Sequence, residues 1–257
     1  MKRKGLFNVT ICFLLVMGQV QAGNKLSLRD ITRGEFRQET MTEVRPMADG
    51  ETYAQISDDG KRIVTCSFKT GKQVGVLFDA ATARGAQIGR VQGYIVSPDG
   101  RRLLIQTNTK PIYRHSFTAE YYIFMIQNNK LEPLSDGGPQ QTPVFSPDGN
   151  QIAFVRDNNI HLVKLLYDNA ESQVTKDGKC NEIINGIPDW VYEEEFSTNS
   201  SMVFSADSKQ IIWIRYDETA VPQYSMQLFK GLAPEKEQYR DYPGDYTYKY
   251  PLAGMQN

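Results

Sequence analysis

The stretch Ser146-Pro147-Asp148-Gly149-Asn150-Gln151-Ile152-Ala153-Phe154 joins a tight turn to an apolar strand. In such a turn proline fixes φ at the first central position, aspartate accepts hydrogen bonds from nearby backbone amides, and glycine takes a positive φ. The pattern recurs in residues 57–65, 97–105 and 205–213. One such segment predicts only a hairpin turn, whereas four in register, each followed by an apolar strand, predict a repeated unit.

The spacing of these turns indicates the kind of repeat. Successive copies begin 40, 49 and 59 residues apart, and periods of about 40–50 residues with several short strands per unit are typical of propeller blades. Residues 72–78, 120–126 and 159–164 are rich in β-branched and aromatic residues and are predicted as further strands. We therefore expect an all-β fold, a partial β-propeller of about four to five blades.

The N-terminus resembles a secretory signal peptide. A basic Lys2-Arg3-Lys4 precedes a mostly apolar stretch over residues 6–17, and Val20-Gln21-Ala22 offers small residues for cleavage. The apolar stretch is shorter than the ~20 residues that a spanning helix needs, although an uncleaved anchor is the alternative. We expect residues 1–22 to be a signal peptide and the mature protein to be secreted or periplasmic.

The remaining chain is expected to form two parts. Residues 23–50 would be a lead-in with a short helix over Leu26–Phe36, capped by Ser27, with Leu28 and Ile31 on one side. This is the only segment that looks helical. Residues 51–257 would form the incomplete propeller domain.

Composition excludes several classes of function. The chain has 29 Lys and Arg against 30 Asp and Glu, so the broad basic face of a nucleic-acid-binding protein is not expected. It contains no CxxC, HExxH, GxGxxG, P-loop or GxSxG pattern, so neither a metal nor a cofactor is expected. Outside the signal peptide the cysteines are Cys66 and Cys180, either two buried small residues or, in an oxidising compartment, a disulfide.

The segment Asp189-Trp190-Val191-Tyr192-Glu193-Glu194-Glu195-Phe196 carries the densest chemistry in the chain. It lies in the longest interval between turns, where repeat proteins place functional insertions. One interpretation is an acidic surface turn. The other is that the aromatic residues hold the carboxylates in a partly desolvated cavity that binds a primary ammonium. Arg114, beside His115, is a second candidate, able to donate to a carbonyl or carboxylate.

These motifs resemble dipeptidyl peptidase IV, in the prolyl oligopeptidase clan of serine peptidases. Asp189–Phe196 is similar to the family's D-W-V-Y-E-E-E segment, and Tyr113–Ser116 to its arginine segment. The segments 146–160, 220–222 and 248–251 follow in the family's order, so the likeness covers almost the whole mature chain. The resemblance implies an eight-bladed propeller joined to an α/β-hydrolase domain.

The resemblance also implies roles for individual residues. Glu194 and Glu195 would grip the free α-amino group of a peptide substrate, and Arg114 would contact the substrate carbonyl and organise the glutamates. The family releases X-Pro and, less readily, X-Ala dipeptides. A tripeptidyl peptidase of the same architecture is an alternative, and a homodimer of the full-length enzyme is a further expectation.

The sequence departs from the family in lacking the serine elbow and the rest of the catalytic triad, so no catalytic residue is assigned here. We expect these 257 residues to be the substrate-recognition region of an enzyme whose α/β-hydrolase domain is missing from the chain. The alternative is a stand-alone, non-catalytic propeller that binds peptide N-termini or a partner protein. An in-frame hydrolase domain downstream in the gene would distinguish the two.

Overall fold

The computed structural model describes residues 26–38, 41, 43–228 and 244–257. The predicted signal peptide, residues 1–22, lies outside these ranges. The chain forms two compact units, residues 1–40 and residues 41–257.

The described part of the first unit holds one short helix, α1 (Leu28–Arg33). The Ser27 hydroxyl accepts a hydrogen bond from the Asp30 amide, and the Asp30 carboxylate accepts one from the Ser27 amide, which is a complete capping box. Gly34, with φ at 71°, ends the helix. The predicted cap is confirmed, but the helix is shorter than Leu26–Phe36 and its apolar residues Leu28 and Ile31 are exposed.

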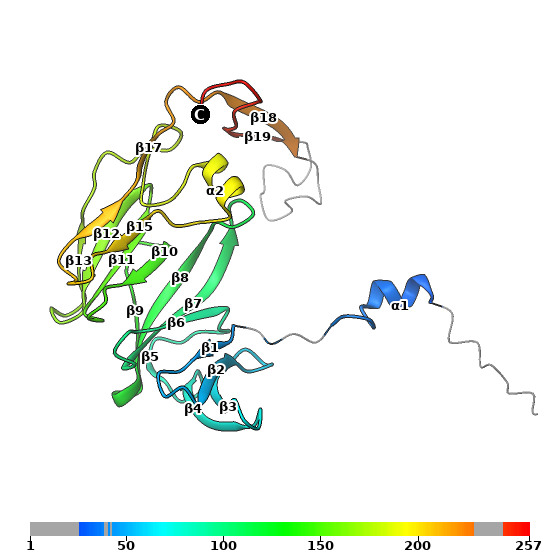
Figure 1. Ribbon diagram of the computed structural model, residues 1–257, viewed down its shortest axis with the longest axis vertical. Coiled ribbons are helices and arrows are strands. Elements are labelled where there is room, and N and C mark those ends of the chain that lie inside the picture. The colour runs from blue at the N-terminus through cyan, green and yellow to red at the C-terminus, as the bar shows by residue number, and fades with distance from the viewer. Residues whose placement is uncertain (1–25, 39–40, 42, 229–243) are drawn as a thin grey trace, which may run out of the picture. The chain divides into compact units, whose positions relative to one another are not determined.

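The second unit begins with three mostly antiparallel sheets in chain order, two of four strands and one of five (Figure 1). The first sheet comprises β1 (Arg45–Pro46), β2 (Thr52–Ile56), β3 (Arg62–Ser67) and β4 (Gln73–Asp79). The second comprises β5 (Arg84–Gly85), β6 (Gly93–Val96), β7 (Arg102–Pro111), β8 (Phe117–Met125) and β9 (Lys130–Pro133), with the 3-10 turn η1 (Ile126–Asn128) before β9. The third comprises β10 (Gln141–Phe145), β11 (Gln151–Arg156), β12 (Asn159–Lys164) and β13 (Ala170–Gln173).

Three two-stranded pairs and a second helix follow. The pairs are β14 (Ile183–Asn185) with β17 (Arg215–Asp217), β15 (Met202–Phe204) with β16 (Ile211–Trp213), and β18 (Gln223–Leu228) with β19 (Gly244–Lys249). Helix α2 (Trp190–Phe196) lies between β14 and β15 in the chain. The fold is mainly β, as predicted, and the predicted strands correspond to β4, β8 and β12.

Neighbouring sheets share hydrophobic cores, because their central strands are buried on both faces. In β7, Leu103 and Ile105 pack into the core shared with the first sheet, whereas Leu104 packs into the core shared with the third. In β11, Phe154 belongs to the core shared with the second sheet, and Val155 to the core shared with β14 and β15. Side chains alternate along a strand, so a continuous apolar run after each turn supplies both faces. Stacked sheets of this kind are the arrangement of propeller blades.

The four repeated turns have the same internal hydrogen bonds. In each copy the aspartate Oδ1 accepts the serine hydroxyl at 2.6 Å. Gly60, Gly100 and Gly149 have φ between 67° and 70°, which explains the glycine in the first three copies. The predicted turn chemistry is confirmed.

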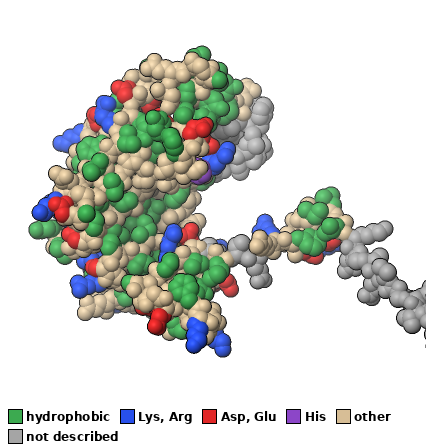
Figure 2. Space-filling view, viewed as in Figure 1, with side chains coloured by type: hydrophobic (Ala, Val, Ile, Leu, Met, Phe, Trp, Pro, Cys, Tyr) green, Lys and Arg blue, Asp and Glu red, His purple; other side chains and the backbone are tan. Residues whose placement is uncertain are grey.

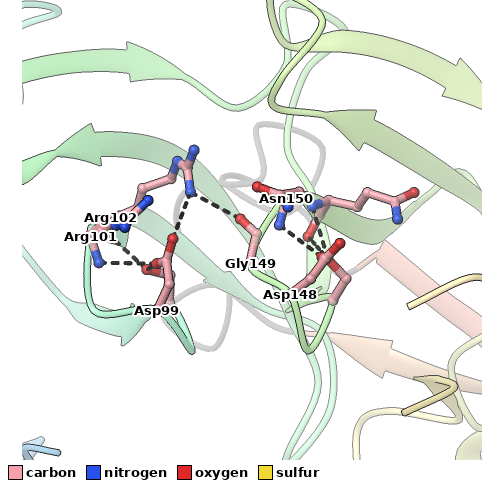
Figure 3. Close-up of polar contacts among 9 residues, drawn as sticks. Asp99, Arg101, Arg102, Asp148, Gly149 and Asn150 are labelled. Atoms are coloured by element: carbon pink, nitrogen blue, oxygen red, sulfur yellow. Dashed lines mark hydrogen bonds and ion pairs between the residues drawn. The ribbon is translucent and has the colours of Figure 1, made fainter. Parts of the chain in front are cut away.

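The turns also connect one sheet to the next. The Arg102 guanidinium donates to the Asp99 carboxylate at 3.2 Å and to the carbonyl of Gly149 at 3.1 Å, joining the second turn to the third (Figure 3). The third turn reaches the fourth through the Asp148 amide, which donates to the Ser208 hydroxyl at 3.0 Å. Ser208 stands where the other copies have glycine, and it has φ at 61°. Its hydroxyl therefore makes a contact between turns that glycine lacks.

Candidate functional site

The acidic segment forms helix α2, so the expectation that only residues 26–36 are helical is wrong. Asp189 is the N-cap, and its Oδ1 accepts from the Tyr192 amide at 2.8 Å. The helix ends at Ser197, which has φ at 52°. Trp190, Val191 and Tyr192 have poor helix propensity, which concealed the helix in the sequence, but the cap and the packing of the segment outweigh that preference.

The first glutamate of the triplet holds the arginine segment. The Glu193 side chain is buried, with 1% exposure, and its Oε1 accepts from the backbone amides of His115 at 2.7 Å and Ser116 at 2.8 Å. The Asn199 side-chain amide, just beyond α2, donates to the carbonyl of His115 at 3.0 Å. These contacts join α2 to the loop between β7 and β8, which we call the arginine loop (residues 112–116).

This junction brings Arg114 to the second glutamate. The Nε of Arg114 lies 3.2 Å from the Oε2 of Glu194. The Arg114 side chain is 74% exposed and that of Glu194 is 16% exposed, so the pair lies at the surface with the carboxylate partly covered. Glu195 is exposed, and within the described residues its carboxylate has no hydrogen bond or ion pair. On the face drawn in Figure 2, acidic, basic and hydrophobic side chains lie beside one another in the region of α2.

Aromatic rings surround the helix. The ring of Trp190 lies 4.2 Å from that of Tyr250, and the ring of Tyr192 lies 5.3 Å from that of Tyr216. On the side of the arginine loop, the ring of Tyr113 lies 5.7 Å from that of Tyr248. Aromatic rings thus pack around the acidic segment as expected, but Glu195 is exposed and does not lie in a desolvated cavity.

A cavity of ≈ 180 Å³ lies next to the junction of α2 and the arginine loop. It is lined by Asp189, Glu193 and Glu218 together with Tyr113 and Trp190, among others. Burial, and secondarily the negative charge of Asp189, raises the pKa of Glu218 to about 7. Burial also raises the pKa of Tyr113 well above its usual range.

The geometry is suited to binding a cationic amine. Glu194 and Glu195 are neighbours in α2 and only Glu194 is paired with a guanidinium, that of Arg114, so the group of three keeps a net negative charge. A primary ammonium has three donors and can bind more than one carboxylate oxygen. Within the described ranges no cluster of His, Cys, Asp and Glu is arranged to hold a metal ion.

Two functional candidates escaped the sequence analysis. Glu193 lies one helical turn after Asp189, so recognising the helix would have placed both on the same side. Glu218 lies beyond β17 and has no local pattern that connects it to α2.

The histidines and cysteines have other roles in the structure. His161 stacks on Phe154, and burial followed by the positive charge of Arg156 lowers its pKa. Cys66 is buried and Cys180 is exposed, and both are free, so neither the disulfide nor the prediction of two buried residues is correct. No helix in the described part of the chain has the length and apolar character to cross a bilayer.

Known proteins share both this sequence and this fold. The family profile described as the dipeptidyl peptidase IV (DPP IV) N-terminal region matches residues 97–257. A probable dipeptidyl-aminopeptidase B of Podospora anserina is 43% identical over 169 residues, which are 63% of this chain and 18% of that protein. Another, of Tuber melanosporum, is 33% identical over 258 residues, which cover 92% of this chain and 28% of that protein.

The crystal structure of Porphyromonas gingivalis dipeptidyl peptidase 4 has the same fold, with a TM-score of 0.82 and 40% identity. The match covers 90% of this chain and 32% of that one. The present chain thus spans between 18% and 32% of the length of these relatives. With the profile matching more than half of its residues, the chain belongs to the family of the dipeptidyl peptidase IV N-terminal region.

Proposed function

We propose that this chain is the substrate-recognition region of a secreted dipeptidyl peptidase IV-like serine exopeptidase. Glu194 and Glu195 bind the free α-amino group of a peptide, and Arg114 contacts its carbonyl and orients the glutamates. The catalytic groups belong to the α/β-hydrolase domain of the family, and X-Pro or X-Ala dipeptides are the products. The predicted signal peptide would send the protein to the periplasm or the exterior.

The observation that carries the proposal is the approach of Arg114 to Glu194 at 3.2 Å. The two residues are eighty positions apart in the chain, and the buried carboxylate of Glu193 holds the loop that carries Arg114. Surface ion pairs contribute little to stability, so an ion pair held by a buried tether points to ligand binding instead.

The test is calorimetric titration of the 257-residue chain with a Gly-Pro-Gly amide and with its N-acetylated form. We expect the free peptide to bind and the acetylated one not to. Glu194→Gln or Glu195→Gln should weaken binding at least tenfold, because losing a hydrogen bond to a charged group costs about 1.5–3 kcal/mol. Glu51→Gln, at an exposed position before β2, is the matched control and should bind normally. Equal binding of both peptides would contradict the proposal.

A stand-alone binding protein is the second candidate. It is favoured by one feature: Arg114, Glu194 and Glu195 all come from this chain, so amine recognition needs no other domain. A chain that binds the Gly-Pro peptide and, expressed from its complete gene, never cleaves it would establish this alternative over the exopeptidase.

A further inference from the structure

Glu218 is a buried carboxyl group that lines the cavity beside α2. It follows β17, and its backbone amide donates to the carbonyl of Glu182 at 2.8 Å. The residue is 7% exposed and lines the cavity of ≈ 180 Å³ beside α2. Among the described residues its carboxyl group has no hydrogen-bonding partner.

Two further buried carboxyl groups line the same cavity. Asp189, 7% exposed, caps α2 through Oδ1 and accepts from the Asn257 side chain at 3.2 Å through Oδ2. Glu193, 1% exposed, accepts the two amides of the arginine loop. Both carboxylates therefore have hydrogen-bond donors in α2, the arginine loop or the C-terminal residue, whereas the Glu218 carboxyl group has none among the described residues.

The other titratable groups near Glu218 do not neutralise it. Lys249 of β19 donates to the carbonyl of Val221 at 2.7 Å and to that of Thr219 at 3.4 Å. Its positive charge lowers the pKa of Glu218, but burial and the negative charge of Asp189 each raise it by more. Tyr113 and Cys180 also line the cavity. A negative charge on Glu218 would add a third anion to the lining of this small cavity.

We propose that Glu218 is a positioning residue for α2, the helix that carries Glu194 and Glu195. While its carboxyl group is neutral, α2 and the arginine loop stay closed over the cavity. When it ionises, burial and the repulsion from Asp189 favour an arrangement in which the carboxylate is hydrated and α2 is less firmly held. The effect of this ionisation on peptide binding rests on the proposed function.

The pKa of Glu218, raised to about 7, places this change near neutrality. The carboxyl group would be about one tenth ionised at pH 6 and about nine tenths ionised at pH 8. The buried carboxyl group holds its proton more tightly than a hydrated carboxyl group does. Raising the pH therefore favours a rearrangement that hydrates the group. Helix α2 and the arginine loop are therefore expected to be closed over the cavity at low pH and to open as the pH rises through 7.

The test uses the fluorescence of Trp190, which lines the cavity. Trp213 is the other tryptophan of the chain, so Trp213→Phe isolates the signal. In the 257-residue Trp213→Phe protein we expect the emission to shift to the red between pH 6 and pH 8, with a midpoint near 7. Adding Glu218→Gln should abolish the transition, whereas adding Glu51→Gln should leave it unchanged.

A further variant separates Glu218 from the imidazole of the arginine loop. Histidine side chains change charge between about pH 5 and 8, so His115→Gln must keep the transition. A flat profile in the Trp213→Phe protein would overturn the proposal. So would a transition that survives Glu218→Gln or disappears in His115→Gln. The Trp213→Phe and His115→Gln profiles remain decisive even if Glu218→Gln does not fold.

Peptide binding supplies the second measurement. The Kd for the Gly-Pro-Gly amide should be equal in wild type and Glu218→Gln at pH 6, and about fivefold lower in Glu218→Gln at pH 8. The comparison cancels the titration of the peptide's own amine, which both proteins experience alike. An equal Kd at both pH values would overturn the proposal. If neither protein binds the peptide while Trp190 titrates as expected, the proposed function fails and the positioning role stands.

Discussion

Three consecutive glutamates have three different environments at the residue scale. Successive residues of a helix point about 100° apart, so one short helix turns Glu193 inward, leaves Glu194 partly covered beside Arg114, and exposes Glu195. The burial separates their tasks. Glu193 holds the arginine loop in place, and Glu194 and Glu195 are the residues proposed to bind the amine.

This division predicts different effects of the same substitution. Glu193→Gln should lower the free energy of unfolding by about 2 kcal/mol, because a buried carboxylate that accepts two amides is replaced by a neutral acceptor. Glu195→Gln should change stability by less than about 0.5 kcal/mol, as exposed substitutions do. Urea denaturation followed by circular dichroism measures both.

The pair is its own control, since the two residues lie on the same helix two positions apart. Glu195→Gln should affect only peptide binding, and Glu193→Gln should affect stability first. Equal stability of the two variants would mean that the contacts of Glu193 with the arginine loop do not hold it in place.

At the scale of elements, the repeated turns and α2 differ in how visible they are in the sequence. The turns are stabilised by hydrogen bonds between residues two to five positions apart, so all the residues that form one turn lie within one nine-residue copy. Helix α2 has one local signal, the Asp189 cap. Otherwise it depends on rings from β17 and β19, on Tyr250 just after β19, and on the arginine loop. Those partners are distant in the chain, which is why the turns were predictable and the helix was not.

The turn aspartates predict a pH dependence of stability. The hydrogen bond from the Ser146 hydroxyl, and next the amide of Asn150, lowers the pKa of Asp148 below its usual value of 3.8. The unfolded chain therefore takes up the proton first as pH falls, so this contribution to stability is present above about pH 4 and is lost as pH falls below it. At pH 7 Asp148→Asn should be less stable than wild type by about 1 kcal/mol, and the difference should shrink towards pH 2.

Asp58 offers the matched control for this measurement. It occupies the proline position of the first turn, and within the described residues its side chain makes no hydrogen bond. Asp58→Asn should therefore follow the wild-type stability profile between pH 7 and pH 2 in urea denaturation. A constant difference between Asp148→Asn and wild type over that range would show that the charge of Asp148 is not what stabilises the turn.

At the scale of the second unit, the stacking of sheets leaves an apolar surface of the β15–β16 pair uncovered. Val203 of β15 and Ile212 of β16 are directly paired in register and are 58% and 60% exposed. Ile214, next to β16, is 53% exposed. The opposite face of the same pair contributes Met202 and Phe204 to a core, so this two-stranded sheet is buried on one face and bare on the other.

The bare face should cause self-association. Exposed apolar strands bind hydrophobic dyes and other copies of a protein, so the Val203→Thr, Ile212→Lys double variant should bind less anilinonaphthalene sulfonate and sediment with a smaller weight-average mass. Leu166→Lys, at an exposed position in the turn after β12, should change neither quantity. If the double variant and wild type sediment alike, the association surface lies elsewhere.

The sequence by itself determined the repeated turns, the strands that follow them and the mainly β fold, and it pointed to Arg114, Glu194 and Glu195 as proposed site residues. All of these depend on short-range hydrogen bonds, on alternation along a strand, or on a motif read in one stretch. Only the tertiary structure decided that Arg114 lies beside Glu194, that Glu193 is the tether, and that Glu218 is buried near Asp189. Those facts depend on burial and on contacts between residues far apart in the chain, and the desolvation that raises the pKa of Glu218 arises only once the sheets, α2 and the loop are assembled.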